Sequence, residues 1–202
     1  MIVLLRVAVV VVLLQVGGCG DMSWIRFLFP QTSQPIAMSD ATLFDFSTAN
    51  TVAAWFPVND GVMGGVSQST LTATNDGTAL FSGDISFKNN GGFATTQSNF
   101  GAPLDLSVYQ GLAIRVRGDG KRYGIYLRDG NRNLLHQATF ETVAGEWQDI
   151  QVPFASFEPT YFGQPARNAN PLNPGRISAI SFIIEYKQEG AFALELARVG
   201  VY

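Results

Sequence analysis

The sequence predicts an all-β domain folded as a jelly-roll β-sandwich. From Ala41 onward, short stretches of alternating apolar and polar residues recur between turn-forming residues, and no stretch shows the apolar period of an ordinary-length helix. The composition agrees, because charged residues make up only 14% of the chain whereas Gly occurs 21 times and Phe 15 times. Many short strands at this spacing are typical of sandwiches and jelly rolls.

The first half of the domain contains strands separated by turns rich in Asn, Asp and Gly. We expect turns at Asn75-Asp76-Gly77 and at Asn89-Asn90-Gly91-Gly92, because these residues tolerate turn conformations. The stretch from Trp55 to Ser69 (WFPVNDGVMGGVSQS) combines apolar residues with turn signals and predicts a shaped loop held against a core. The expected strands cover residues 43–46, 66–72, 79–87 and 93–98.

The second half continues the alternating pattern. Gly118-Asp119-Gly120 predicts a hairpin turn between two strands, and Pro153 places the end of its strand at an edge or a bulge. Ile177 to Tyr186 is almost continuously apolar, which is typical of a central strand. Glu158 to Arg176 contains four prolines and predicts the longest irregular loop. Further strands are expected over residues 112–116, 123–127, 136–140, 150–154, 192–196 and 199–202.

The amino terminus resembles a lipoprotein-type export signal. Arg6 precedes an apolar run from Val7 to Leu14, whose length suits a signal peptide better than a membrane span. Val16-Gly17-Gly18-Cys19 resembles a bacterial lipobox, in which the cysteine accepts a diacylglycerol, and Cys19 is the single cysteine of the chain.

These features predict a signal peptide at residues 1–18, lipidation of Cys19, a tether at residues 19–40 and the folded domain at residues 41–202. The domain would then be anchored to a membrane and face the periplasm or cell envelope. Translation from Met38 would instead give a cytoplasmic protein.

The composition also argues against several classes of function. The net charge is −3 and no basic run occurs, so nucleic acid is not expected as a partner. A single cysteine excludes an intrachain disulfide, and a single histidine excludes a multi-histidine metal site. No cofactor is expected.

Enzymatic activity is not expected either. His136 lies in the middle of a predicted strand without a nucleophile motif, so a hydrolase that uses it is the least favoured hypothesis. A glycosidase would need two facing carboxylates, and nothing in the sequence brings such a pair together. A calcium site made by Asn59, Asp60 and nearby carbonyls is physically possible, but no regularly spaced acidic cluster supports it.

Two loops form the candidate binding surface. We expect polar and apolar side chains to contact a partner and the intervening glycines to shape the backbone that presents them. The candidate residues are Asn59, Asp60, Met63, Gly64, Gly65, Asn89, Asn90, Gly91, Gly92 and Phe93. Aromatic residues could alternatively form a sugar-stacking platform, although core or rim packing is commoner for them. They are Trp55, Tyr123, Tyr126, Trp147, Tyr161 and Phe162.

Two motifs carry a resemblance to a known family. The motif W-x-x-x-N-D-G-V-M-G-G-x-S-x-S at Trp55 to Ser69 and the motif F-S-G-x-I-S-x-x-N-N-G-G-F-A at Phe81 to Ala94 resemble the signature of the complex I intermediate-associated protein 30 family. Later stretches fit in the same order, so the resemblance extends over about residues 41–202.

The resemblance implies a galactose-binding-like jelly roll and a non-enzymatic role. Mitochondrial members of the family are chaperones for the assembly of respiratory NADH:ubiquinone oxidoreductase. We therefore expect a binding or assembly-factor module whose partner is a protein client, such as a subunit of complex I or of another membrane complex. The alternative is a carbohydrate-binding module of the cell envelope, with a glycan as the ligand.

Overall fold

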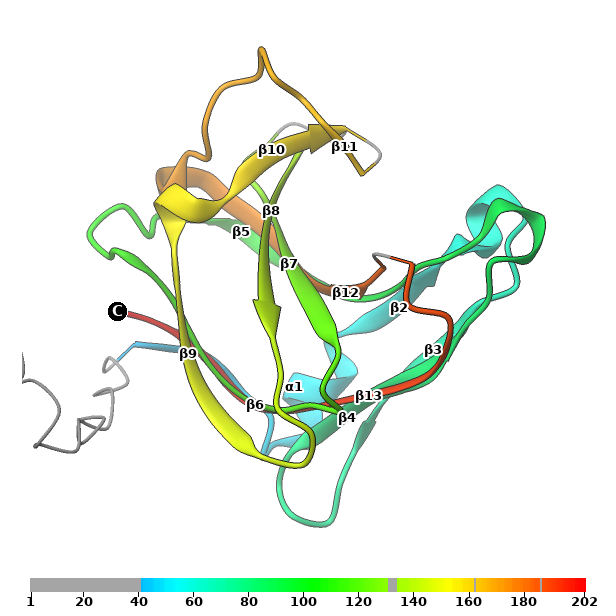
Figure 1. Cartoon of the computed structure of the whole chain (residues 1–202). Coiled ribbons are helices and arrows are strands. Elements are labelled where there is room, and N and C mark those ends of the chain that lie inside the picture. The colour runs from blue at the N-terminus through cyan, green and yellow to red at the C-terminus, as the bar shows by residue number, and fades with distance from the viewer. Residues whose placement is uncertain (1–40, 131–133, 162, 186) are drawn as a thin grey trace, which may run out of the picture. The chain divides into compact units, whose positions relative to one another are not determined.

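The computed structural model describes residues 41–130, 134–161, 163–185 and 187–202. These residues fold into two antiparallel sheets that enclose one core, which confirms the predicted jelly-roll β-sandwich (Figure 1). The expected signal peptide, the lipidation site Cys19 and the tether lie outside the described residues. Within the described part of the chain, no helix is long and apolar enough to cross a membrane.

One sheet has six strands in the order β3-β4-β13-β6-β9, and β1 pairs with β13 beside this path. The strands are β1 (Thr42–Asp45), β3 (Gln68–Ala73), β4 (Ala79–Ile85), β6 (Gly111–Arg117), β9 (Trp147–Pro153) and β13 (Gly190–Val201). Strand β9 lies at the edge of this sheet, in agreement with the position predicted from Pro153.

The other sheet has seven strands in the order β11-β10-β8-β7-β12-β5-β2. The strands are β2 (Phe56–Asn59), β5 (Ala94–Leu104), β7 (Arg122–Arg128), β8 (Leu135–Glu141), β10 (Glu158–Tyr161), β11 (Gln164–Pro165) and β12 (Ile177–Ile184). Strand β12 lies between β7 and β5, which confirms the central strand predicted from its continuous apolar sequence. The helices are short: α1 (Ala49–Ala53) and one-turn 3₁₀ helices at Asp60–Met63, Lys88–Asn90, Phe154–Ser156 and Pro174–Arg176.

The core lies between the sheets and is rich in aromatic residues. Trp55 follows α1 and packs against Phe44, Phe46 and Phe182, with ring centroids 5.0 Å, 5.5 Å and 5.7 Å away. Burial of one large apolar side chain contributes about 1.5–3 kcal/mol, so this cluster is a substantial part of the core. Because Trp55 directly precedes β2, its burial fixes the strand that leads into the loop at residues 59–67.

The predicted hairpin at Gly118-Asp119-Gly120 is wrong. Strand β6 pairs with β13 and β9, whereas β7 belongs to the other sheet, so this segment carries the chain from one sheet to the other. Asp119 stabilises the crossing by accepting hydrogen bonds from the Tyr123 hydroxyl at 2.9 Å and from the Ala193 amide at 3.0 Å. Alternation in sequence assigns the faces of a strand but not the sheet to which it belongs.

The segment from Glu158 to Arg176 is not the fully irregular loop that its prolines predict. It begins with β10, which pairs with β8, and continues into the two-residue strand β11. The Thr160 hydroxyl donates to the carbonyl of Gln164 at 3.0 Å and closes this tight turn. Proline is tolerated here because β11 forms the edge of the sheet and pairs with β10 only at Thr160 and Tyr161, so Pro159 lies outside that pairing.

Candidate functional site

The two loops predicted to form the binding surface meet in the structure. Residues 59–67 and residues 86–93 lie side by side at one end of the sandwich (Figure 1, cyan and green), and we call them together the two-loop platform. Asp60 joins them. Its Oδ2 accepts hydrogen bonds from the Gly92 amide at 2.7 Å, from the Phe93 amide at 3.4 Å and from the Ser67 hydroxyl at 2.5 Å. Its Oδ1 accepts a hydrogen bond from the Ser67 amide at 2.9 Å.

Four glycines shape the loops around this carboxylate. A Cβ on Gly65 would lie 2.4 Å from Asp60 Cγ, and a Cβ on Gly91 would lie 2.5 Å from Asp60 Oδ2. Gly64 and Gly92 instead adopt positive φ, at +90° and +137°, where other residues are strained. The glycines of the two motifs therefore provide the room and the turn conformations that enclose the Asp60 side chain.

Asp60 is ionised at neutral pH. Burial opposes ionisation, but the hydrogen bonds from Ser67, Gly92 and Phe93 outweigh it and hold the pKa of Asp60 below its ordinary value of 3.8. Asp60 is also fully buried, and all of these hydrogen bonds come from the two loops themselves, so Asp60 fastens the loops together.

The platform presents apolar side chains to solvent. Met63 is 68% exposed, Val66 is 47% exposed and Phe87 is 40% exposed. Asn89 and Asn90 are exposed at the tip of the second loop, where both adopt left-handed backbone conformations. Asn59 accepts a hydrogen bond from the Ser69 hydroxyl at 2.6 Å and so supports the base of the first loop.

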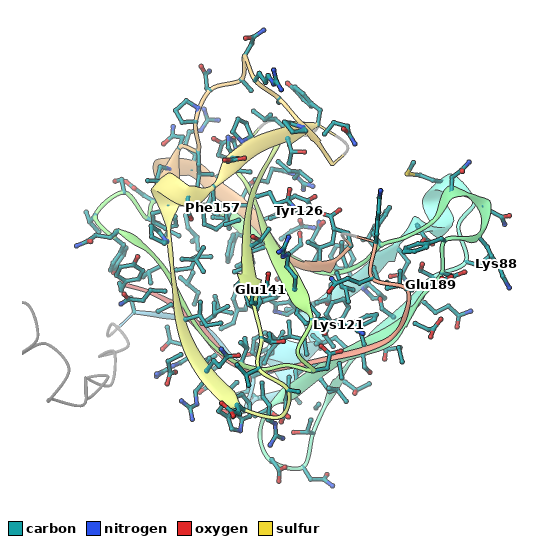
Figure 2. The ribbon with its side chains drawn as sticks, viewed as in Figure 1. Lys88, Lys121, Tyr126, Glu141, Phe157 and Glu189 are labelled. Atoms are coloured by element: carbon teal, nitrogen blue, oxygen red, sulfur yellow. The ribbon has the colours of Figure 1, made fainter. Side chains whose placement is uncertain are left out.

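A groove adjoins the platform on the outer face of the seven-stranded sheet. It encloses about 500 Å³, within the range of about 300–1,000 Å³ that is usual for ligand pockets. Figure 2 labels Tyr126 on this sheet and Lys88 on the neighbouring loop. The groove is lined by Val58, Met63, Phe93, Thr95, Gln97, Tyr126, Arg128, Leu135, Gly163, Ser181, Ile183 and Glu185.

A row of polar side chains crosses the floor of the groove. Tyr126 on β7 is the register partner of Ser181 on β12, and Ser181 is the partner of Gln97 on β5. On the other side, Tyr126 pairs with Gln137 on β8. Side chains of paired residues project from the same face of a sheet, so these four residues form one line perpendicular to the strands. We call them the polar row.

Glu185 is held at the edge of the groove by two members of the polar row. Its Oε1 accepts hydrogen bonds from the Tyr126 hydroxyl at 3.2 Å and from Gln137 Nε2 at 2.5 Å. Burial, followed by the nearby Glu185 carboxylate, raises the pKa of Tyr126. The Tyr126 hydroxyl is therefore protonated throughout the physiological range and acts as a donor to Glu185.

His136 is turned away from the groove. It is fully buried, and its Nε2 lies 3.1 Å from the carbonyl oxygen of Asn170, to which it donates in the corresponding tautomer. This bond ties the loop after β11 to β8, so His136 has a structural role. The described part of the chain contains no group of three or more acidic, cysteine or histidine residues that could hold a metal ion.

The aromatic residues considered for sugar stacking do not gather on one surface. Trp55 and Tyr123 are buried in the core, and Tyr126 lies in the groove floor with only 6% exposed. Trp147 on β9 lies under the guanidinium groups of Arg115 and Arg117, at 5.4 Å and 5.0 Å from its centroid. Tyr161 is exposed, and Phe162 lies outside the described residues.

No sequence motif marks the polar groove residues Gln97, Arg128, Ser181 and Glu185 as members of one site. One signal was available for Ser181, because it is a polar residue in the middle of an otherwise apolar central strand. The other residues belong to strands whose neighbours cannot be read from the sequence, so their convergence appears only in the fold.

Residues 44–196 match the protein family described as Complex I intermediate-associated protein 30. The mitochondrial complex I intermediate-associated protein 30 of Mus musculus is 26% identical over 191 residues, which cover 84% of this chain and 58% of that protein. The corresponding Drosophila melanogaster protein is 26% identical over 184 residues, which cover 79% of this chain and 62% of that protein. The chain thus spans less than two thirds of the length of either relative.

The fold is shared with the Family 11 Carbohydrate-Binding Module of a cellulosomal cellulase from Clostridium thermocellum. The TM-score is 0.61 at 17% identity, with coverage of 82% of this chain and 95% of that module. At this identity the likeness concerns the fold alone. The family match, in contrast, includes both loops of the platform and most of the two sheets, and the chain belongs to the complex I intermediate-associated protein 30 family.

Proposed function

We propose that this protein is a non-enzymatic binding module that holds a protein client on the two-loop platform. The observation that carries the proposal is the exposure of Met63, Val66 and Phe87 on loops that the buried Asp60 fastens together. Exposed apolar side chains are common at protein interaction sites, and methionine adapts readily to a partner surface. A platform ordered in advance loses less conformational entropy when it binds.

The names of the mitochondrial relatives support the kind of client. They describe proteins associated with complex I intermediates. By analogy, the client of this chain is a subunit of respiratory NADH dehydrogenase or of another membrane complex, and the protein acts as a chaperone-like assembly factor. The chain shares only part of the length of those relatives, so the client itself has to be identified directly.

Photo-crosslinking in cells that produce the full chain tests this proposal. A photo-reactive phenylalanine derivative replaces Met63 on the platform and, as a control, Val108, which is 84% exposed in the turn before β6. We expect a subunit of a membrane respiratory complex to be crosslinked from position 63 and not from position 108. Recovery of the same proteins from both positions, or of none, would refute the proposal.

A matched pair of substitutions tests the apolar contact. Val66 on the platform and Val143 between β8 and β9 are both 47% exposed. A charge placed in an apolar interface is costly because it must lose its hydration. We expect Val66→Asp to reduce recovery of the client at least about tenfold, which corresponds to about 1.4 kcal/mol, and Val143→Asp to leave it unchanged.

We also propose that a lipid on Cys19 tethers the module to a membrane, facing the periplasm or cell envelope. The lipobox-like Val16-Gly17-Gly18-Cys19 supports this localisation. The intact mass of the protein from its native host should correspond to a chain that begins at lipidated Cys19. A mass that corresponds to an unmodified chain beginning at Met38 would contradict the tether and indicate a cytoplasmic protein.

A further inference from the structure

We propose that the groove beside the platform is a second ligand site, which binds an uncharged, hydroxyl-rich chain, namely a neutral oligosaccharide, across the strands of the seven-stranded sheet. This inference goes beyond the protein client proposed for the platform, because it concerns the floor of the seven-stranded sheet and a different chemical class of ligand, although Met63 and Phe93 of the platform line one side of the groove.

The first observation is the hydroxyl of Ser181. Ser181 lines the groove, is only 7% exposed and makes no side-chain hydrogen bond with any described residue. Its hydroxyl is not enclosed by the protein, so water or a ligand in the groove can reach it. The neighbouring Thr95 differs, since its hydroxyl donates to the carbonyl of Val58 at 2.6 Å. The Ser181 hydroxyl is therefore available to a ligand that reaches the floor.

The second observation is the alignment of polar groups on both sides of Ser181. The polar row places Gln137, Tyr126, Ser181 and Gln97 on four adjacent strands, so it extends over roughly 14 Å at the usual strand spacing. Phe56, the register partner of Gln97 on edge strand β2, continues the row with an aromatic ring that is 42% exposed. Amides and hydroxyls at this repeat suit a chain that presents hydroxyls along its length.

The third observation is the charge of the groove. Its lining contains one cation, Arg128, and one anion, Glu185, so their charges balance. Glu185 Oε1 accepts hydrogen bonds from Tyr126 and Gln137, whereas no described residue donates a hydrogen bond to Glu185 Oε2. A carboxylate oxygen that remains available accepts hydrogen bonds from hydroxyls. These features favour an uncharged ligand over a polyanion or a polycation.

The floor is less suited to an extended peptide. Strands β7, β12 and β5 are each paired on both sides, so their backbone groups are already used and no peptide can join them as an additional strand. A peptide backbone lying on Ile183 and Val58 would leave its own amides and carbonyls without partners. A sugar ring can instead rest an apolar face on these side chains while its hydroxyls reach the polar row.

Isothermal titration calorimetry with the full chain tests this inference. The probes are cellotetraose, xylotetraose and chitotetraose as neutral ligands, with oligogalacturonate as a charged ligand of similar size. We expect at least one neutral tetrasaccharide to bind and oligogalacturonate to bind more weakly. Failure of all three neutral probes to bind at millimolar concentration, or preferential binding of oligogalacturonate, would overturn the inference.

Two substitutions in the row locate the site. Loss of one neutral hydrogen bond weakens binding by about three- to tenfold, so we expect that effect from Ser181→Ala and from Gln97→Ala. The controls are Ser82→Ala and Gln151→Ala on the other sheet, which should bind like the unmodified protein. Ser181→Ala should also retain the unmodified thermal stability, because the Ser181 side chain makes no hydrogen bond with a described residue.

The variants separate this inference from the proposed client interaction. Val66→Asp should impair client capture without changing sugar affinity, and Ser181→Ala should do the reverse. Sugar binding that Ser181→Ala and Gln97→Ala leave unchanged would overturn the groove assignment. Loss of client crosslinking from position 63 in Ser181→Ala, without any sugar binding, would assign the groove to the protein client and overturn the inference.

Discussion

Asp60 connects two loops that are far apart in the chain. Its bond to the Gly92 amide joins residues 32 positions apart, and its bonds to Ser67 close the first loop on itself. Hydrogen bonds to a charged group contribute about 1.5–3 kcal/mol each, more than neutral ones. A single carboxylate can therefore order a surface that contains little regular secondary structure.

Replacement of Asp60 by asparagine should destabilise the protein. The asparagine side chain would have the same shape but would present an amide nitrogen to backbone and hydroxyl donors, so at least one donor would lose its acceptor. We expect a loss of about 2–4 kcal/mol in the free energy of unfolding, measured by urea denaturation at pH 7. Asp76→Asn in the exposed turn after β3 is the control and should change stability by less than about 0.5 kcal/mol.

The pH dependence of this loss follows from the lowered pKa of Asp60. A carboxyl whose folded pKa lies below its ordinary value stabilises the fold fully above that ordinary value, here 3.8, and loses the contribution as the pH falls through the folded pKa. The stability difference between the unmodified protein and Asp60→Asn should thus be constant from pH 5 to 7 and shrink below about pH 4. A difference that grows on acidification would contradict the assigned role.

Two glycines of the first loop provide a comparison of steric effects. A Cβ at Gly65 would overlap Asp60 Cγ, whereas a Cβ at Gly61 would meet no atom within 4 Å. Overpacking of this kind costs about 1–3 kcal/mol, so we expect Gly65→Ala to lower the free energy of unfolding by that amount. Gly61→Ala should be nearly neutral in the same denaturant titration, and equal losses at both positions would refute the steric explanation.

At the scale of elements, β13 is fastened to its neighbours by one ion pair with little solvent exposure. Glu195 on β13 accepts hydrogen bonds from Arg117 Nε at 2.9 Å and Nη2 at 2.5 Å, and from the Thr78 hydroxyl at 2.5 Å. Only 10% of the Glu195 side chain is exposed. The interaction links β13 to β6 and to the turn before β4, so it supports the centre of the six-stranded sheet.

Replacement of Glu195 by glutamine should therefore lower the free energy of unfolding more than replacement of the more exposed Asp149 by asparagine. We expect Glu195→Gln to lower the free energy of unfolding by about 1–2 kcal/mol, because the partly exposed Arg117 recovers some hydration. Asp149 pairs with Arg115 on the same sheet but both side chains are about one-third or more exposed, so Asp149→Asn should cost at most about 0.5 kcal/mol. Chemical denaturation of both variants in parallel measures the difference.

The elements also show where local sequence patterns succeed and fail. A nearly continuous apolar run correctly predicted the central strand β12, and alternation predicted the faces of β6, because side-chain direction in a strand has a period of two. It did not predict the strands β10 and β11, since Pro159 and Pro165 are unfavourable except at a sheet edge. Edge position is a property of the assembled sheet.

At the scale of the whole molecule, one core joins the two sheets. Phe182 of the seven-stranded sheet is fully buried and packs against Trp55 at 5.7 Å and Phe140 at 6.5 Å between ring centroids. A domain with a single core is expected to unfold cooperatively. A substitution that destabilises one sheet should therefore destabilise the other sheet as well.

Replacement of Phe182 by alanine tests this cooperativity. The cavity should lower the free energy of unfolding by about 3–5 kcal/mol. Hydrogen exchange measured by mass spectrometry should show faster exchange in β13 of the opposite sheet as well as in β12. Faster exchange confined to the seven-stranded sheet would mean that the sheets unfold separately.

The β-sandwich, most strands and the two loops of the platform could be predicted from the sequence, because they depend on local patterns: alternation, turn-forming glycines and a family motif. Even the pairing of the loops was foreseeable, although the burial of Asp60 was not. The tertiary structure alone decided the groove. Tyr126, Ser181 and Gln97 come from three separate strands and meet only because strand order and register align them. Local sequence specifies which face a residue occupies, whereas long-range strand pairing decides which residues become its neighbours.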